Sequence, residues 1–460
     1  MGKQMVGLET EFKNNILSYS RESTPKYNQS RGVSSIFKKN GLPRIDPPQV
    51  ISSWKNSAFA QKPMTCILAL MFCSLRAQSV GAEFQVNSYT TNNQSLANVA
   101  MDGLGNSIIV WSSFDQDGDR WGIYGKRYDS AGTPIGSEFQ VSTFFSSNQI
   151  RPDVAMDGSG NFVVVWWSLS QDTDDYGIYG QRYDSVGDQE GSEFLVNTHT
   201  MGAQRDVSIA MGESGNFIIV WASLDQDGDG WGVYSRRYDS TGTPQSSEFQ
   251  VNSHTTSHQS APSVAMDSSG NFIVVWQSLG QDGDGSGVYG QRFDNAGNPV
   301  GLEFQINTYT TSFQSSPSVA MDGSGNFVVA WQSFIQDGDN DGIYGQRYDA
   351  DGNPIGSEFR VNTCYFYIQR NPSIAMDDSG NFVVVWQSDN QDGDDLGVIG
   401  QQYDITGSPL GPEFQVNTYI LDNQSNPAIA MEPDGNYIVV WQSYGQDGDG
   451  YGVYGQRYEP

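Results

Sequence analysis

Pairs of aspartates separated by one residue recur along the chain in short loops that mostly contain glycine. Carboxylates at alternate loop positions can converge on one hard cation, and Ca²⁺ takes about six to eight oxygen ligands at about 2.3–2.6 Å. We therefore predict that these loops are candidate calcium sites. The first aspartates of the pairs are Asp117, Asp172, Asp227, Asp282, Asp337, Asp392 and Asp447, and the second are Asp119, Asp174, Asp229, Asp284, Asp339, Asp394 and Asp449.

The same loops can also be explained as tight turns. Asp-Gly favours hairpin turns, but a turn alone does not account for two invariant aspartates, since nearby like charges repel. The fuller pattern Asp-x-Asp-x-Asp-Gly occurs at Asp225–Gly230 and at Asp337–Gly342. Neither copy has a closing acidic residue, because Val233 and Gly345 stand in that place, so a calcium site would borrow ligands such as Gln259.

The loops belong to a unit of 55 residues that is copied seven times without insertion or deletion. Fixed periods of this kind are typical of propellers, solenoids and arrays. Three residue types keep the period. They are the glutamate of a Glu-Phe pair (Glu83, Glu138, Glu193, Glu248, Glu303, Glu358, Glu413), a tryptophan (Trp111, Trp166, Trp221, Trp276, Trp331, Trp386, Trp441) and a glutamine (Gln94, Gln149, Gln204, Gln259, Gln314, Gln369, Gln424).

Each copy is predicted to hold four short strands, separated by Gly/Asn-rich turns. In the copy that begins at Pro317 we expect them at Ser318–Met321, Phe327–Gln332, Ile343–Tyr348 and Glu358–Val361. The second strand is almost entirely apolar, which indicates that both of its faces are covered. Blades stacked face to face would cover them. In that arrangement the acidic loops lie on the same face as the long connections between copies, and we expect function there.

The ends of the repeat region predict a closed ring. The last copy stops after a third strand, whereas residues 83–87 form an isolated fourth strand before the first copy. Pairing the two would remove exposed sheet edges. We therefore predict an all-β, seven-bladed β-propeller of four antiparallel strands per blade, closed by the N-terminal strand. An open β-array is the alternative.

Two stretches resemble known repeats. The loop Asp225–Gly230 resembles the calcium loops of FG-GAP repeats in integrins. The sequences VAMDGSGNFV from Val319 and YDADG from Tyr348 resemble the NHL repeat of β-propellers. The resemblance implies a propeller fold and calcium-binding loops. The units also resemble those of large secreted bacterial proteins.

The N-terminal part is different in character. Residues 1–63 are rich in Ser, Asn, Lys and Pro and are predicted to be a disordered or over-called extension. Residues 64–82 resemble a secretory signal peptide with cleavage after Ala77 or Ala82, and their apolar run is shorter than the roughly 20 residues that span a bilayer. A disordered tail with a short buried segment is the alternative. The propeller is predicted over 83–460, outside the cell or at its surface, without a membrane span.

Charge and motifs restrict the function. Residues 1–80 carry eleven Lys/Arg and four Asp/Glu, and the remainder carries thirteen against forty-nine. An acidic body argues against a nucleic-acid partner. The tryptophan series is expected to pack between blades. Arg127 and its equivalents are expected to form ion pairs with Asp129 and its equivalents within each blade.

The leading prediction is a secreted or cell-surface binding and adhesion propeller, a monomer that binds an extracellular protein or glycan, with Ca²⁺ as its only expected cofactor. The repeated loops favour several equal weak sites, so we predict that the chain is not an enzyme. A lectin-like propeller is the alternative, using aromatic residues that follow the acidic loops, such as Trp121, Tyr176 and Trp231. The third candidate is a glycan-active hydrolase or lyase with a site over the central channel.

Overall fold

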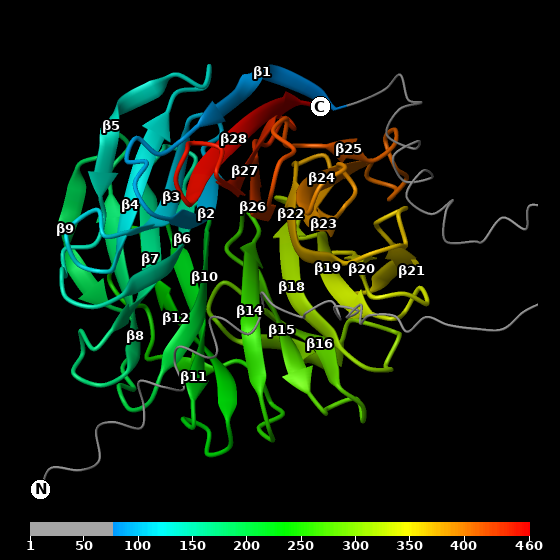
Figure 1. The fold of residues 1–460 in the computed structure, drawn as a ribbon. Coiled ribbons are helices and arrows are strands. Elements are labelled where there is room, and N and C mark those ends of the chain that lie inside the picture. The colour runs from blue at the N-terminus through cyan, green and yellow to red at the C-terminus, as the bar shows by residue number, and fades with distance from the viewer. Residues whose placement is uncertain (1–76) are drawn as a thin grey trace, which may run out of the picture. The chain divides into compact units, whose positions relative to one another are not determined.

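The computed structural model describes residues 77–460, which form seven four-stranded antiparallel sheets arranged around a central axis (Figure 1). The predicted seven-bladed propeller is confirmed. The sheets β2–β5, β6–β9, β10–β13, β14–β17, β18–β21 and β22–β25 are called blades 1 to 6, and β26–β28 with β1 form blade 7. The predicted segment 1–63 and most of the segment 64–82 lie outside the described residues.

The inner strands, which surround the axis, are β2 (Gln94–Met101), β6 (Gln149–Met156), β10 (Gln204–Met211), β14 (Gln259–Met266), β18 (Gln314–Met321), β22 (Gln369–Met376) and β26 (Gln424–Met431). The second strands are β3 (Ser107–Phe114), β7 (Phe162–Leu169), β11 (Phe217–Leu224), β15 (Phe272–Leu279), β19 (Phe327–Phe334), β23 (Phe382–Asp389) and β27 (Tyr437–Tyr444).

The third strands are β4 (Trp121–Tyr128), β8 (Tyr176–Tyr183), β12 (Trp231–Tyr238), β16 (Ser286–Phe293), β20 (Asp341–Tyr348), β24 (Leu396–Tyr403) and β28 (Tyr451–Glu459). The outer strands are β5 (Pro134–Gln140), β9 (Gln189–Leu195), β13 (Phe249–Gln250), β17 (Pro299–Gln305), β21 (Pro354–Arg360), β25 (Phe414–Gln415) and β1 (Gln78–Gln85). None of the described residues forms a helix long and apolar enough to cross a membrane.

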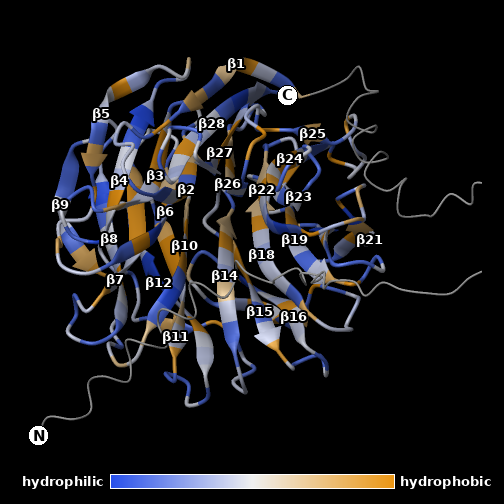
Figure 2. Cartoon of the chain, viewed as in Figure 1, coloured by the Kyte–Doolittle hydropathy of each residue, from blue (hydrophilic) through white to orange (hydrophobic). Residues whose placement is uncertain are grey.

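The second strands form the core because they are apolar on both faces, and each face is covered by a neighbouring blade. Figure 2 shows apolar residues along the strands and polar residues in the loops at their ends. All seven repeated tryptophans are 0% exposed. Trp331 of blade 5, for example, packs in one cluster with Ile273 and Val275 of blade 4. The tryptophan series is therefore inter-blade packing, as predicted.

The N-terminal strand closes the ring. β1 pairs antiparallel with β28, and Phe84 lies opposite Gly455. The Glu83 carboxylate accepts a hydrogen bond of 2.6 Å from the backbone N–H of Thr418. Because β1 begins at Gln78, residues 78–82 belong to the sheet, although the sequence assigned them to the signal-like segment. Of the two predicted cleavage positions, only the one after Ala77 leaves β1 intact.

The Arg127 series joins neighbouring blades instead of pairing with aspartate in its own blade. Arg182 in blade 2 donates to the carbonyl oxygens of Ser240 and Thr241 in blade 3, at 2.7 and 2.6 Å. The predicted pairing with the aspartate two residues later, Asp184 for Arg182, is therefore wrong, although Arg182 also pairs with Glu190 of its own blade. The interaction is with main-chain carbonyls of a turn that follows the third strand of the next blade, a partner that spacing within one repeat does not reveal.

Gln402 replaces the arginine of this series in blade 6, where the turn that would accept its hydrogen bonds is missing. Blade 7 takes its outer strand from β1, so no turn joins its third and outer strands. Gln402 instead donates a hydrogen bond of 3.2 Å to the Tyr437 hydroxyl. Arg457 of blade 7 continues the series across the closure and donates to the Ser130 carbonyl of blade 1 at 2.7 Å.

Candidate functional site

The two aspartates of each acidic loop hold the loop in place. Asp117 Oδ1 accepts the backbone N–H of Asp119 at 3.3 Å, and Asp117 Oδ2 accepts the Gln140 side chain at 3.0 Å. Asp119 Oδ2 accepts the backbone N–H of Ser147 at 3.2 Å, in the connection that leads to blade 2. The acidic loops and the blade-to-blade connections therefore lie on one face, as predicted, and we call it the loop face.

Burial differs between the two aspartates of a pair. The first aspartate is half-buried and the second is mostly exposed. Desolvation raises the pKa of Asp117, and it raises the pKa of Asp392 to about 6. Within residues 77–460, no three His, Cys, Asp or Glu side chains form a group that could hold a metal ion. Calcium binding by the loops stays a prediction.

Gln259, suggested above as an additional calcium ligand, is occupied elsewhere. Its side chain is 0% exposed, accepts from Asn252 Nδ2 at 3.1 Å and donates to the Thr256 carbonyl at 2.8 Å. The glutamine series therefore fixes the start of each inner strand. The repeated glutamates are also structural, since Glu303 accepts the Ser253 backbone N–H at 2.6 Å and the Gln281 amide at 2.6 Å.

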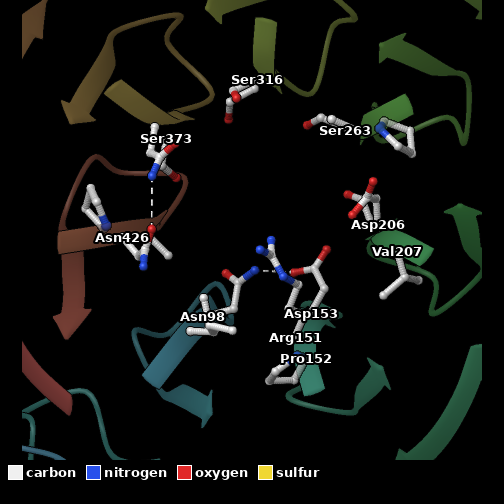
Figure 3. A pocket seen from close by; sticks show the side chains of 18 of the residues that line it. Asn98, Arg151, Pro152, Asp153, Asp206, Val207, Ser263, Ser316, Ser373 and Asn426 are labelled. Carbon is white, nitrogen blue, oxygen red and sulfur yellow. Dashed lines mark hydrogen bonds between the residues drawn. The ribbon is translucent and has the colours of Figure 1, made fainter. Parts of the chain in front are cut away.

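The central channel contains a cavity of about 360 Å³. It is lined by three consecutive residues from each of the seven inner strands, and by Trp167. Figure 3 shows Asn98, Arg151, Asp153 and Asp206 facing this opening from neighbouring strands. We call this region the channel site. The lining positions are residues 96–98, 151–153, 206–208, 261–263, 316–318, 371–373 and 426–428.

A β-bulge in every inner strand presents these residues. The first residue of each triplet has a positive φ, between 50° and 55°, and the strand register shifts there. A positive φ is uncommon for residues other than glycine, and bulges often re-aim side chains next to functional sites. The positions are Leu96, Arg151, Asp206, Ala261, Ser316, Asn371 and Asn426.

Most bulges are fixed by a polar side chain of the preceding blade. Gln442 Oε1 accepts the backbone N–H of Leu96 at 3.0 Å, and Ser112 Oγ accepts that of Arg151 at 3.0 Å. In blades 2 and 3 the equivalent residues are Trp167 and Ala222, whose side chains have no acceptor. The sequence therefore loses this repeated acceptor in blades 2 and 3, the same blades that place charged residues in the channel.

Asp153 is the carboxylate at the third lining position, where the other copies have Asn, Ser or Ala. Its Oδ1 accepts Asn98 Nδ2 at 2.5 Å, and its Oδ2 accepts the backbone N–H of Ile209 at 2.9 Å. It thus joins three blades. Desolvation by the surrounding protein outweighs these hydrogen bonds and raises the pKa of Asp153 to about 6.

Aromatic rings orient the arginine of the site. The Arg151 guanidinium lies 5.3 Å from the ring centroid of Trp167, within cation–π range. Trp167 in turn packs edge-on against Tyr176, with centroids 5.6 Å apart. Trp167 is buried, so its ring packs against Arg151 from the protein interior. The exposed guanidinium faces the channel.

Sequence reasoning missed the channel residues because it followed what the copies share. The signal was present in the differences: aligned at the period of 55, only copies 2 and 3 place charged residues at the lining positions. Such a comparison would have selected Arg151, Asp153 and Asp206. It could not have shown that the inner strands carry a bulge that turns these side chains into the channel.

No protein-family model matches this chain, and no curated protein matches it. Among solved structures it resembles a protein of unknown function from Dyadobacter fermentans, with 10% identity, a TM-score of 0.48, and coverage of 84% of this chain and 99% of that one. A Penicillium chrysogenum α-L-arabinanase complexed with arabinobiose has 14% identity, a TM-score of 0.46, and coverage of 67% and 92%. The NanB sialidase of Streptococcus pneumoniae has 10% identity, a TM-score of 0.44, and coverage of 83% and 70%.

The prediction that this chain is not an enzyme is wrong as an inference from its architecture. The similar structures include proteins named as an arabinanase, an α-L-arabinofuranosidase and a sialidase. At these identities the likeness shows the fold alone. The expected relation to NHL and FG-GAP repeats, the secretion and the bacterial source stay predictions.

Proposed function

We propose that this propeller binds a glycan in the channel site. The main observation in support is that the channel lining combines a guanidinium, two carboxylates and a set of amides and hydroxyls around one opening of about 360 Å³. Polyhydroxylated ligands need several directed hydrogen bonds, which such a lining supplies. The lining would suit an apolar ligand poorly.

The break in the repeat supports the same conclusion. The invariant Gln, Glu and Trp residues and the Arg series each have a structural contact within or between blades, so their repetition is explained by the fold. Arg151, Asp153 and Asp206 lie where the repeat would accept small polar residues. The raised pKa of Asp153 costs stability at neutral pH, and such costs are typical of functional positions.

One observation favours hydrolysis of the bound glycan as a second function. Because the pKa of Asp153 is about 6, this carboxyl is partly protonated near neutral pH and could give a proton to a glycosidic oxygen. Asp206 lines the same opening and supplies a second carboxylate. In such a reaction the glycosidic bond breaks, the leaving oxygen takes the proton of Asp153, and water gives its hydroxyl to the other fragment and its proton to Asp206.

For the loop face we also propose adhesion at a cell surface and calcium binding by the acidic loops. They are compatible with a glycan in the channel, since that face surrounds the channel entrance. Calcium would fix the loops by binding the carboxylate oxygens of Asp117, Asp119 and their equivalents. A glycan and a protein partner remain alternative ligands of this face.

A glycan array probed with the full chain tests the proposed function. We expect binding to a subset of saccharides, its loss in Asp206→Ala, and its retention in Asp239→Asn, which removes a carboxylate from a turn outside the channel lining. Titration of a soluble saccharide then gives the affinity. Absence of binding to every saccharide, or equal effects of the two variants, would overturn the proposal.

A further inference from the structure

Three arginines of blades 1 to 3 differ from the other arginines of the propeller in their contacts. After residue 80 the chain has thirteen basic residues against forty-nine acidic ones, so carboxylate partners are abundant. Most of the arginines donate to carbonyls or form ion pairs. Within residues 77–460, however, no ion pair is made by Arg120, Arg151 or Arg205. We call these three residues the arginine patch.

The patch is held together by aromatic side chains. Arg205 lies 4.2 Å from the ring centroid of Trp231 and Arg151 lies 5.3 Å from that of Trp167. Tyr176 packs against Trp167, with ring centroids 5.6 Å apart. Burial and the charge of Asp175 raise the pKa of the Tyr176 hydroxyl, whereas a hydrogen bond with Asn148 and the charges of Arg205 and Arg120 lower it. The charges of Arg205 and Arg120 thus both act on this hydroxyl, although the two arginines come from different blades.

Aligned copies show that this arrangement is specific to blades 1 to 3. The residue equivalent to Arg205 in blade 6 is Arg370, which forms an ion pair of 2.5 Å with Asp341. Arg205 has Tyr176 in the place of that aspartate. The substitution removes the internal carboxylate and leaves the guanidinium available, stacked on a ring and fixed in direction. Arginine in this state is suited to bidentate binding of an external oxyanion.

We propose that the arginine patch selects glycans that carry an anionic group, a carboxylate or a sulfate on the sugar. This inference rests on the proposed function, since it names the class of glycan that the channel site accepts. Neutral residues of the saccharide would occupy the polar channel, and the guanidinium groups of the patch would bind the anionic group. The surrounding acidic loops would repel an anion that does not reach the patch.

Binding of matched oligosaccharides to the full chain tests this proposal. We would compare an oligogalacturonate, a neutral galactan and a sulfated galactan of equal length by calorimetry. The expected result is that the anionic forms bind at least about tenfold more tightly than the neutral one. The uronate and sulfate arms then show which anionic group is preferred. Raising the salt concentration should reduce the difference.

Three variants make the test specific. Arg205→Gln should abolish the preference for the anionic form while retaining neutral binding, and Arg205→Lys should restore it only in part, because ammonium lacks the planar fork. Arg370→Gln, the matched change in blade 6, should leave both affinities unchanged. Thermal unfolding of each variant checks that the ring is intact.

The outcomes separate the two proposals. If the neutral and anionic saccharides bind equally, or if Arg205→Gln keeps the preference, the anionic selection is wrong and glycan binding stands. If none of the saccharides binds, glycan binding fails and the selection fails with it.

Discussion

Asn98 and Asp153 occupy the same position in adjacent repeats, and their side chains meet in a hydrogen bond of 2.5 Å across the blade boundary. Lining residues of blades 1 and 2 therefore contact each other directly. A substitution in one copy changes the environment of the next. Between blades 4 and 5, Ser263 Oγ accepts the backbone N–H of Val319 at 3.3 Å, as Asp153 Oδ2 accepts that of Ile209 between blades 2 and 3.

Replacing Asp153 by serine, the residue of blades 3 to 6 at this position, should make stability less dependent on pH. The pKa of Asp153 is raised to about 6, so the folded state holds its proton more tightly than the unfolded state, and the wild type loses stability as pH rises from about 4 to about 6. Asp153→Ser removes this loss. The free energy of unfolding of the variant relative to wild type should improve by about 2 kcal/mol between about pH 4 and pH 8.

Chemical denaturation at several pH values measures this difference. Ser318→Ala in blade 5 is the control, because it changes the equivalent position without removing a titrating group. A constant difference between Asp153→Ser and wild type across the range would contradict the raised pKa.

The inter-blade arginines should contribute measurably to stability. Arg292 donates to the Ala350 carbonyl of the next blade at 2.5 Å, and hydrogen bonds from charged groups contribute about 1.5–3 kcal/mol. Arg292→Gln should therefore lower the free energy of unfolding by about 1–2 kcal/mol, because the donor is partly exposed. The reciprocal change Gln402→Arg should give no gain, since blade 7 has no turn in the matching place. A gain as large as the loss at Arg292 would show that the arginine acts without that turn.

Calcium should raise the unfolding temperature if the loop prediction is right. A ligand that binds only the folded state stabilises it by about 2.7 kcal/mol at a hundredfold excess over Kd. We expect an upward shift between EGTA and millimolar Ca²⁺ that is reduced by Asp229→Asn. The control is Asp239→Asn, a turn aspartate whose carboxylate accepts the Thr243 backbone N–H at 2.9 Å and lies outside the acidic loops. An unchanged unfolding temperature for wild type would leave the aspartates with their structural role alone.

Removing β1 should open the ring. A chain that begins at Gln78 keeps the strand, and one that begins at Val86 exposes the edge of β28. Free edges favour association between chains. We expect the shorter chain to unfold at lower temperature and to self-associate in light scattering, whereas the chain from Gln78 should stay monodisperse. Equal behaviour of the two chains would mean that the pairing of β1 with β28 adds little.

Much of the fold follows from the sequence because local patterns and the period agree. Phe327 begins β19 where the apolar run predicts it, and β1 closes the ring as the incomplete last copy indicates. The inner strand was predicted to begin at Ser318, but β18 begins at Gln314. The bulge at Ser316 and the following Pro317 break the alternation expected of a strand, and proline is tolerated at such bulges.

The candidate site was less accessible to prediction. The acidic loops were selected because they are invariant, yet Asp117 and Asp119 have hydrogen-bond partners in adjacent segments that the repeat does not reveal. Arg151 and Asp153 are single departures from the pattern. Their proximity to Trp167 and to the next blade depends on strand pairing and ring closure, which bring together residues more than one repeat apart.

The pairing of β1 with β28 also sets the order in which the chain can fold. Asn87 accepts the backbone N–H of Val453 although the two residues are 366 positions apart. Six blades can each assemble within one continuous stretch, whereas the seventh must wait until both ends of the repeat region meet, which carries the largest loop-closure entropy. Blade 7 should be the last to acquire protection against amide hydrogen exchange during refolding and the first to lose it.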